Sequence, residues 1–281
     1  MRKFLIYTNK SKDPELETTG KICDYLKTQG ISTEVVVSRR DTPYDEKIEM
    51  GDDEMPELVL VLGGDGTVLQ ASRETSECGA PIAGINLGNV GYLTEVEING
   101  IEEALDRFVS GDYHIEHRMM LDGEINQEAS CSVALNDIVV SKHGKTGVLD
   151  VVIYVNGMLL NSYRADGMIL TTPTGSTGYN LSAGGPIASP ESDILIMTPI
   201  CPHTITQRSI VLPAGDVVEI EIPQARDGEE QEADVIFDGK PLALIKTGDR
   251  IVVKRSEKKT DFARLDNTSF LDVLHRKLGG Y

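Results

Sequence analysis

The sequence predicts an α/β protein with a parallel-sheet domain at the N-terminus and a β-rich domain after it. Strand-like and helix-like stretches alternate over the N-terminal third of the chain, which is typical of a parallel sheet. Residues 58–62 are a continuous apolar run, as expected of a central strand buried on both faces. After about Tyr113, short β-rich runs follow one another with turn residues between them. The first part is therefore predicted to be Rossmann-like.

In the N-terminal part, Lys3–Thr8 and the β-branched residues 33–37 predict two strands. Asp13-Pro14-Glu15 is typical of a helix start and Gly30 of a helix end. The apolar face of this predicted helix consists of Leu16, Ile22, Cys23 and Leu26. The remaining predictions are a mobile surface segment at 42–56, a strand at 82–85 and a helix at 101–109.

In the C-terminal part, Asn156-Gly157 between residues 151–155 and 158–163 predicts a β-hairpin. Apolar residues at helical spacing predict a terminal helix over 269–278, which we expect to return to the first domain. Further strands are predicted at 194–197, 217–222 and 251–254.

The length of 281 residues indicates two domains, at roughly 150 residues per domain. We expect an α/β domain that carries Gly63–Thr67 over 1–113 and a β-rich domain over 114–264. Residues 265–281 are expected to form the C-terminal helix that packs on the first domain.

The chain is acidic, with 27 Lys and Arg against 45 Asp and Glu and a net charge of −18. This charge argues against a general nucleic-acid binder, which needs a basic face. It leaves a nucleotide substrate open, because a local cation or bound magnesium can neutralise phosphates. No apolar run approaches the roughly 18 residues of a membrane helix, and the N-terminal apolar run is too short for a signal peptide. The scattered cysteines, without CxxC, predict buried reduced thiols in the cytoplasm.

The motif Gly63-Gly64-Asp65-Gly66-Thr67 follows the buried strand and precedes a helical stretch at 68–72. Glycines let the backbone approach a ligand closely, and amides at a helix N-terminus suit phosphate. The Asp65 carboxylate could take a proton from a hydroxyl or hold magnesium. The alternative is a plain strand-to-helix turn with Asp65 as N-cap. Because ligands of α/β proteins bind at the carboxyl ends of strands, we favour a functional role.

A second segment, residues 166–186, runs from a strand into a loop rich in hydroxyls and glycines, with one tyrosine. Hydroxyls and free amides suit ribose and phosphate, and an aromatic ring offers a face to a base. A hydroxyl-rich hairpin loop remains the alternative. Cys201 and His203 make a poor metal pair without further ligands, so we predict a packing role for them.

Together with further motifs in the same order, these segments resemble the NAD kinase family of ATP- or polyphosphate-dependent NAD 2′-phosphotransferases. GGDGT alone also occurs in lipid kinases, whereas the stretch at 172–187 is far more specific. The motifs are GGDGT at 63–67, NLGNVGYL at 86–93, Asn136-Asp137, Arg164-Ala165-Asp166-Gly167, residues 172–187 and 198–213, and Asp238-Gly239.

The resemblance implies that Asp65 is the general base for the 2′-hydroxyl of the adenosine ribose of NAD. It implies that Gly63, Gly64, Gly66 and Thr67 hold the phosphates of ATP or polyphosphate. Arg164 and Asp166 could reach the NAD site from a neighbouring subunit. The residues it places around NAD are Asp65, Gly66, Asn136, Asp137, Arg164, Asp166, Thr177, Gly178, Tyr179, Asn180, Leu181 and Ser182.

The same resemblance implies Mg²⁺ or another divalent cation arriving with ATP, no protein-held metal, and a cytoplasmic homodimer or homotetramer without nucleic-acid or membrane partners. The chain departs from the family at Gly178, where Ala is usual, at Asp137, where many members have Glu, and at Lys240, where many have Gln. Two other interpretations stay open. One is a lipid or other small-molecule kinase that shares GGDGT, and the other is an NAD-binding sensor without catalysis.

Overall fold

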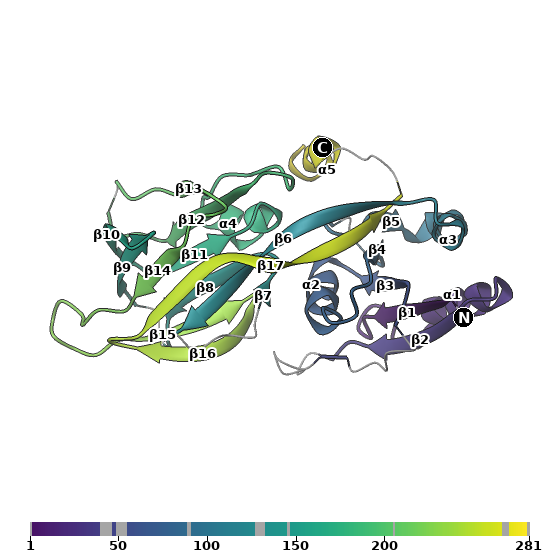
Figure 1. Cartoon of the computed structure of the whole chain (residues 1–281), viewed down its shortest axis with the longest axis horizontal. Coiled ribbons are helices and arrows are strands. Elements are labelled where there is room, and N and C mark those ends of the chain that lie inside the picture. The colour runs from purple at the N-terminus through teal and green to yellow at the C-terminus, as the bar shows by residue number, and fades with distance from the viewer. Residues whose placement is uncertain are drawn as a thin grey trace. The chain divides into compact units, whose positions relative to one another are not determined.

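A computed structural model of the chain describes residues 2–39, 47–48, 55–88, 91–126, 133–144, 147–204, 206–265 and 270–279 (Figure 1). It consists of two compact units, one made of Met1–His117 and Thr260–Tyr281 and the other of Arg118–Lys259. We call them unit 1 and unit 2. The divisions fall within strands β6 (His114–Ile125) and β17 (Arg250–Arg264), so both strands continue from one unit into the other.

Unit 1 contains the predicted parallel sheet, in the strand order β4-β3-β1-β2. Every residue of β3 is buried, which confirms the prediction of a central strand. The end of β17 pairs with β4 through Phe262 and Ile82. The strands are β1 (Lys3–Thr8), β2 (Ser32–Val37), β3 (Leu58–Gly63), β4 (Ile82–Asn86) and the short β5 (Val96–Glu97) beside β4.

Helices cover both faces of this sheet. Ile22 of α1 and Phe108 of α3 share one apolar core with Leu60 of β3. On the other face, the Tyr7 hydroxyl donates a 2.6 Å hydrogen bond to Glu74 of α2. The helices of unit 1 are α1 (Glu17–Thr28), α2 (Asp65–Glu74), the 3-10 turn η2 (Ile98–Gly100), α3 (Ile101–Ser110) and α5 (Phe270–Leu278).

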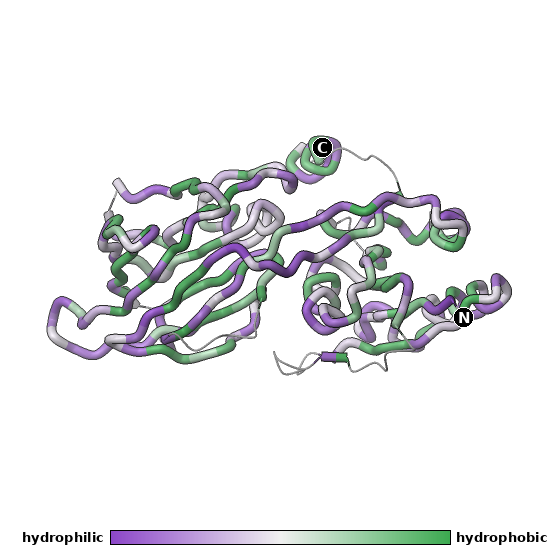
Figure 2. The backbone as a smooth tube through the Cα atoms, viewed as in Figure 1, coloured by the Kyte–Doolittle hydropathy of each residue, from purple (hydrophilic) through white to green (hydrophobic). Residues whose placement is uncertain are grey.

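Unit 2 is built from antiparallel strands, as predicted for a β-rich domain. One sheet has the order β13-β12-β11-β8-β15-β16, and a second contains β10-β9-β14-β17. In Figure 2, hydrophobic residues run along many of these strands. The strands are β7 (Val133–Ala134), β8 (Asp137–Lys142), β9 (Leu149–Val155), β10 (Met158–Ala165), β11 (Gly167–Thr171), β12 (Ile194–Ile200), β13 (Ile210–Pro213), β14 (Val218–Glu221), β15 (Glu232–Phe237) and β16 (Lys240–Lys246).

Two tight hairpins in unit 2 follow from their turn residues. Asn156 and Gly157 have φ of 50° and 76° and connect β9 to β10, which confirms the predicted hairpin. Asp238 and Gly239 have φ of 46° and 78° and connect β15 to β16 in the same way. Positive φ at both central residues is the requirement of a two-residue turn that matches the twist of its strands.

The start of the first helix was predicted too early. Leu16 has a left-handed φ of 56°, so α1 begins at Glu17 and Leu16 lies outside its apolar face. Asp13 still caps the helix from a distance, because its carboxylate accepts a 2.9 Å hydrogen bond from the Thr19 amide. Most of the segment 42–56, predicted to be mobile, lies outside the described residues.

The cysteine prediction was wrong in part. Cys78 is buried and Cys23 half-buried, but Cys201 is exposed and has a φ of 45°, so it does not pack as predicted. Cys131 lies outside the described residues.

In α5, the Lys277 ammonium lies 5.1 Å from the centre of the Tyr92 ring of unit 1. Within the parts of the chain given above, no helix is long and apolar enough to span a membrane.

Two glycines should respond oppositely to alanine. Gly20 lies inside α1 with open space around the position of a Cβ, whereas Gly157 needs its φ of 76°. We expect Gly20→Ala to raise the free energy of unfolding by about 0.5–1 kcal/mol. Gly157→Ala should lower it by about 1–2 kcal/mol. Urea denaturation measures both, and a neutral Gly157→Ala would contradict the described turn.

Candidate functional site

The GGDGT motif lies at the edge of unit 1 where the parallel strands end. The amide of Leu87, after β4, donates a 3.0 Å hydrogen bond to the Gly63 carbonyl, and the amide of Asn9, after β1, donates one of 2.9 Å to Leu62. The segments that follow β1, β3 and β4 therefore meet at this edge, the place where open α/β sheets bind their ligands.

Asp65 is held in place by a neighbouring loop. Its two carboxylate oxygens accept hydrogen bonds of 2.8 Å from the Tyr92 amide and 3.0 Å from the Leu93 amide. The N-cap of α2 is Gly64, so the alternative that Asp65 caps the helix is wrong. In the described part of the chain, no side-chain hydrogen bond from the N-cap residue caps the start of α2, and Asp65 is only half-buried.

Two glycines near Asp65, Gly63 and Gly91, are required by close contacts. A Cβ on Gly64 or Gly66, in contrast, would meet nothing within 4 Å among the described residues. A Cβ on Gly91 would lie 1.9 Å from Asp65 Oδ1, and one on Gly63 would lie 2.3 Å from Thr67 Oγ1. Thr67 is buried, and its hydroxyl accepts a 2.8 Å hydrogen bond from Asn9 Nδ2. The exposed part of the motif is therefore Gly66, with half-buried Gly64 and Asp65 beside it.

In unit 2, the backbone of residues 135–137 is tied down from two sides. Asp238 Oδ1 accepts hydrogen bonds of 2.7 Å from the Asn136 amide and 3.1 Å from the Asp137 amide, and its Oδ2 accepts one of 2.8 Å from the Leu135 amide. On the carbonyl side, the Asn136 oxygen accepts the amide and hydroxyl hydrogens of Thr172 and Thr171, each at 2.9 Å. We call Leu135, Asn136, Asp137 and Asp238 the amide clamp.

The two side chains that the clamp presents are unusual for buried groups. Asn136 Oδ1 is buried and has no hydrogen-bond partner among the described residues. Asp137 is 5% exposed, and its pKa is raised to about 7, first by burial and then by the nearby charge of Asp238. A buried acceptor without a partner and a carboxyl that titrates near neutrality are features of a ligand site.

The hydroxyl-rich segment is a rigid loop rather than an open hairpin turn. It contains the 3-10 turn η3 (Thr174–Thr177) and the short helix α4 (Tyr179–Ser182), which the predicted strand pattern missed. Asn180 is fully buried, donates to the carbonyls of Ser176 and Pro186, and accepts from the Thr198 hydroxyl. The Asn180 side chain therefore supports the loop.

The loop places Tyr179 near other predicted site residues. Tyr179 is 48% exposed, and its pKa is raised by burial and by nearby Cys201, Asp166 and Asp137. A Cβ on Gly178 would lie 3.6 Å from Asn136 Nδ2. Asn136, Asp137, Gly178 and Tyr179 are thus brought together, while Thr177 and Leu181 are half-buried beside them and Ser182 is exposed.

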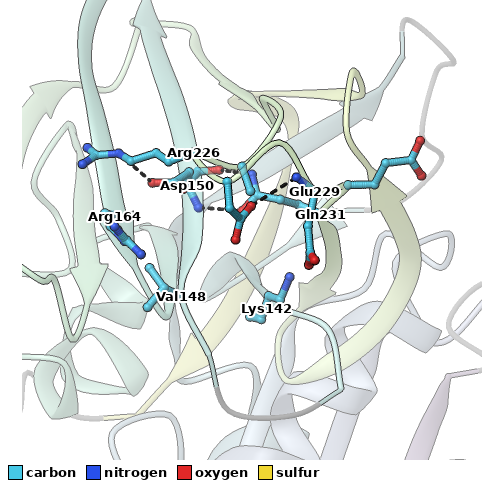
Figure 3. Close-up of a pocket in the computed structure, with 10 residues that line it drawn as sticks. Lys142, Val148, Asp150, Arg164, Arg226, Glu229 and Gln231 are labelled. Atoms are coloured by element: carbon cyan, nitrogen blue, oxygen red, sulfur yellow. Dashed lines mark hydrogen bonds and ion pairs between the residues drawn. The ribbon is translucent and has the colours of Figure 1, made fainter.

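Arg164 does not join this group within the chain. In the pairing of β8 with β11, Asp137 lies opposite Thr171 and Ser141 opposite Gly167. Arg164, the last residue but one of β10, comes three residues before Gly167 and therefore lies near the end of this strand pair that is far from Asp137. There it lines a cavity of about 430 Å³ together with Lys142, as Figure 3 shows. Asp166 is exposed, but it lies near enough to Tyr179 to raise the pKa of the phenol.

The sequence interpretation did not anticipate the hydrogen bonds of Asp238 to residues 135–137 or the close approach of Gly91 to Asp65. Asp-Gly between two β-rich runs is a signal for a hairpin turn, but it does not show where the Asp carboxylate points. Lys240, for which a role was predicted, is half-buried at the start of β16. Across the described ranges, no group of three His, Cys, Asp or Glu side chains could hold a metal ion.

The raised pKa of Asp137 predicts a pH-dependent stability. Its folded pKa of about 7 lies above the ordinary value of 3.8, so its contribution to stability is lost as the pH rises from about 4 through 7. Asp137→Asn cannot ionise. We therefore expect the variant to gain stability relative to the wild type as the pH rises. Its free energy of unfolding minus that of the wild type should be higher at pH 8 than at pH 5 by on the order of 2 kcal/mol. Urea denaturation at both pH values measures this, with Asp249→Asn as control, and a pH-independent difference would refute it.

The comparisons with known proteins agree with the motifs. The sequence matches the family model of the ATP-NAD kinase N-terminal domain over residues 33–113 and that of the ATP-NAD kinase C-terminal domain over residues 135–265. The NAD kinase of Agathobacter rectalis is 39% identical over 282 residues, covering 100% of both chains. The NAD kinase of Acetivibrio thermocellus is 36% identical over 291 residues, covering 99% of this chain and 97% of the relative.

Solved structures show the same fold. The structure of an NAD kinase from Archaeoglobus fulgidus in complex with ATP has a TM-score of 0.78, with 26% identity and 100% of each chain covered. Yeast NADH kinase complexed with NADH has a TM-score of 0.85 at 23% identity, covering 99% of this chain and 88% of that one. Because both domain models match in order and curated relatives align along the full length, the chain belongs to the NAD kinase family.

Proposed function

We propose that the chain transfers the terminal phosphoryl group of ATP to the 2′-hydroxyl of the adenosine ribose of NAD, which yields NADP and ADP. The observation that carries this proposal is the Asp65 carboxylate, held by the Tyr92 and Leu93 amides beside the glycines of the GGDGT loop. The curated relatives are named NAD kinases. The comparisons support neither a lipid kinase nor a sensor without catalysis.

In the proposed reaction, Asp65 accepts the proton of the 2′-hydroxyl as the ribose oxygen attacks the terminal phosphorus. A new bond forms between that oxygen and phosphorus, and the bond from the phosphorus to the bridging oxygen of ATP breaks. The electron pair of the broken bond leaves with ADP. Because phosphoryl transfer depends mainly on positioning and charge stabilisation, the fixed orientation of Asp65 matters as much as its basicity.

The phosphates of ATP, entering as its magnesium complex, would contact the backbone of the GGDGT loop. Exposed Gly66 offers its backbone amide at the first turn of α2, where the helix dipole favours anions, whereas the amide of half-buried Gly64 donates a long 3.5 Å hydrogen bond to the Thr67 hydroxyl. Gly63 and Thr67 would support the loop, because the Thr67 side chain packs against Gly63 where a larger residue would not fit. ATP is our proposed donor, with polyphosphate as the second candidate. ATP is bound in the structure of the NAD kinase from Archaeoglobus fulgidus.

NAD would bind unit 2 around the amide clamp. The unpartnered Asn136 oxygen and the Asp137 carboxyl suit ribose hydroxyls, and the half-exposed Tyr179 ring suits a base. Arg164 and Asp166 would belong to the same site and would contribute from a neighbouring subunit of a cytoplasmic homodimer or homotetramer. The half-buried Lys240 would contact the nicotinamide half or a phosphate of NAD.

The direct test is NADP formation from NAD, ATP and magnesium, measured with a coupled NADP-specific dehydrogenase. Asp65→Asn should lower kcat by about 10²-fold or more. It should change the KM for NAD much less than kcat, since the one remaining side-chain oxygen can still accept a hydrogen bond from the Tyr92 or the Leu93 amide. Asp24→Asn, an exposed site on α1, is the matched control. Near-normal turnover in Asp65→Asn would refute its role as general base.

Gly91 provides an independent test of how Asp65 is oriented. In Gly91→Ala the new methyl group would lie 1.9 Å from Asp65 Oδ1, so the carboxylate must move. We expect kcat to fall by at least about tenfold, because small misplacements of a catalytic group have large effects. Gly100→Ala, where nothing lies within 4 Å of the added Cβ, should behave like the wild type. Equal kcat values for the two variants would show that the contact to Gly91 is unimportant.

A further inference from the structure

We propose that Asp238 is a positioning residue for NAD binding, which fixes the backbone that presents Asn136 and Asp137 through its hydrogen bonds to three consecutive amides. The proposal rests on the function proposed above, in which these two side chains contact the ribose. Asp238 would not itself touch a substrate.

The geometry of the turn explains why this residue is an aspartate. Asp238 is the first central residue of the β15–β16 turn, where its φ of 46° is a conformation that Asp and Asn adopt more readily than other residues with side chains. From there the carboxylate faces the chain just before β8, and its hydrogen bonds reach the amides of residues 135–137 at 2.7–3.1 Å. The Asp238 amide returns a 3.0 Å hydrogen bond to the Asp137 carbonyl.

The Asp238 carboxylate supplies what an uncharged side chain could not. The three amides are distributed over both of its oxygens, and hydrogen bonds to a charged acceptor are about twice as strong as neutral ones. An asparagine retains one oxygen and turns an N–H group toward at least one of these amides. The Asp238→Asn variant therefore keeps the size of the side chain but loses part of the clamp.

Asp238 also acts on Asp137 through its charge. The groups that bear on the Asp137 carboxyl are the Asp238 carboxylate, which raises its pKa, and the Tyr179 phenol, which is neutral near pH 7. As an anion, Asp137 accepts hydrogen bonds from ribose hydroxyls better than as a neutral acid. The KM for NAD should therefore rise as the pH falls through about 7, the pKa of Asp137. Removing the Asp238 charge lowers this pKa, so the rise should move to lower pH.

The test combines hydrogen exchange with kinetics in Asp238→Asn. The whole protein is exchanged and then digested, and mass spectrometry of the peptides follows the amides at 135–137. Their exchange should become at least about tenfold faster, since each amide loses a charged acceptor. The KM for NAD at pH 8 should rise by about tenfold, while the KM for ATP stays within about twofold. The ratio of the KM for NAD at pH 6 to that at pH 8 should be smaller than in the wild type. A purely structural role would not change this ratio.

Asp249→Asn is the matched control, because Asp249 also accepts a backbone amide beside a β-hairpin, from Lys246 at 2.8 Å. Unchanged exchange at 135–137 in Asp238→Asn would overturn the positioning proposal. Faster exchange with an unchanged KM for NAD would instead refute the roles of Asn136 and Asp137 in NAD binding. Asp238→Gly, which tolerates the same φ, is the second variant, and failure of both variants to fold would assign Asp238 to folding alone.

Discussion

The candidate site depends on carboxylates that are held by consecutive backbone amides. Asp238 gathers the amides of Leu135, Asn136 and Asp137, and this arrangement decides where two polar side chains point. Burying a carboxylate is costly unless its oxygens are hydrogen-bonded. The three N–H donors offset part of that cost for Asp238.

The same device appears in unit 1 with a different purpose. Asp65 is held by the Tyr92 and Leu93 amides, and the absence of a side chain at Gly91 makes room for this contact. The amides come from a loop that follows β4, whereas Asp65 follows β3. The orientation of the carboxylate thus depends on the pairing of two parallel strands. Packing of the buried strand β3 is thereby connected to the geometry of the reactive group.

Features that depend on local chemistry could be predicted from the sequence. The apolar run at 58–62 is strand β3, and Asn156-Gly157 is a tight turn, because both follow from periodicity and backbone preference. The start of α1 was misplaced because the left-handed φ of Leu16 is not a property that leucine indicates. Cys201 was expected to pack, but it follows the last residue of β12 and is exposed there.

Long-range contacts could not be predicted in this way. Asp238 lies about a hundred residues along the sequence from the amides whose hydrogen bonds it accepts. The pairing of β15 with β8 brings them together. Asn180 stood among the predicted NAD-binding residues because the family resemblance places the stretch 177–182 around NAD, yet its side-chain atoms are hydrogen-bonded inside the loop. Arg164 lies near Asn136 in neither sequence nor strand register.

The acidity of the chain explains why backbone amides suit the binding of its anionic ligands. With a net charge of −18, the protein repels polyanions at long range, so ATP and NAD must be recognised by groups that act at close quarters. Backbone amides meet this need, because their dipoles are fixed by the fold and add no net charge. At the GGDGT loop the exposed Gly66 lies in the first turn of α2, where its amide suits phosphate, whereas the amides of the clamp are already used by Asp238. The clamp thus presents the Asn136 oxygen and the Asp137 carboxyl rather than its own amides, and these acceptors suit the hydroxyls of a ribose better than a phosphate.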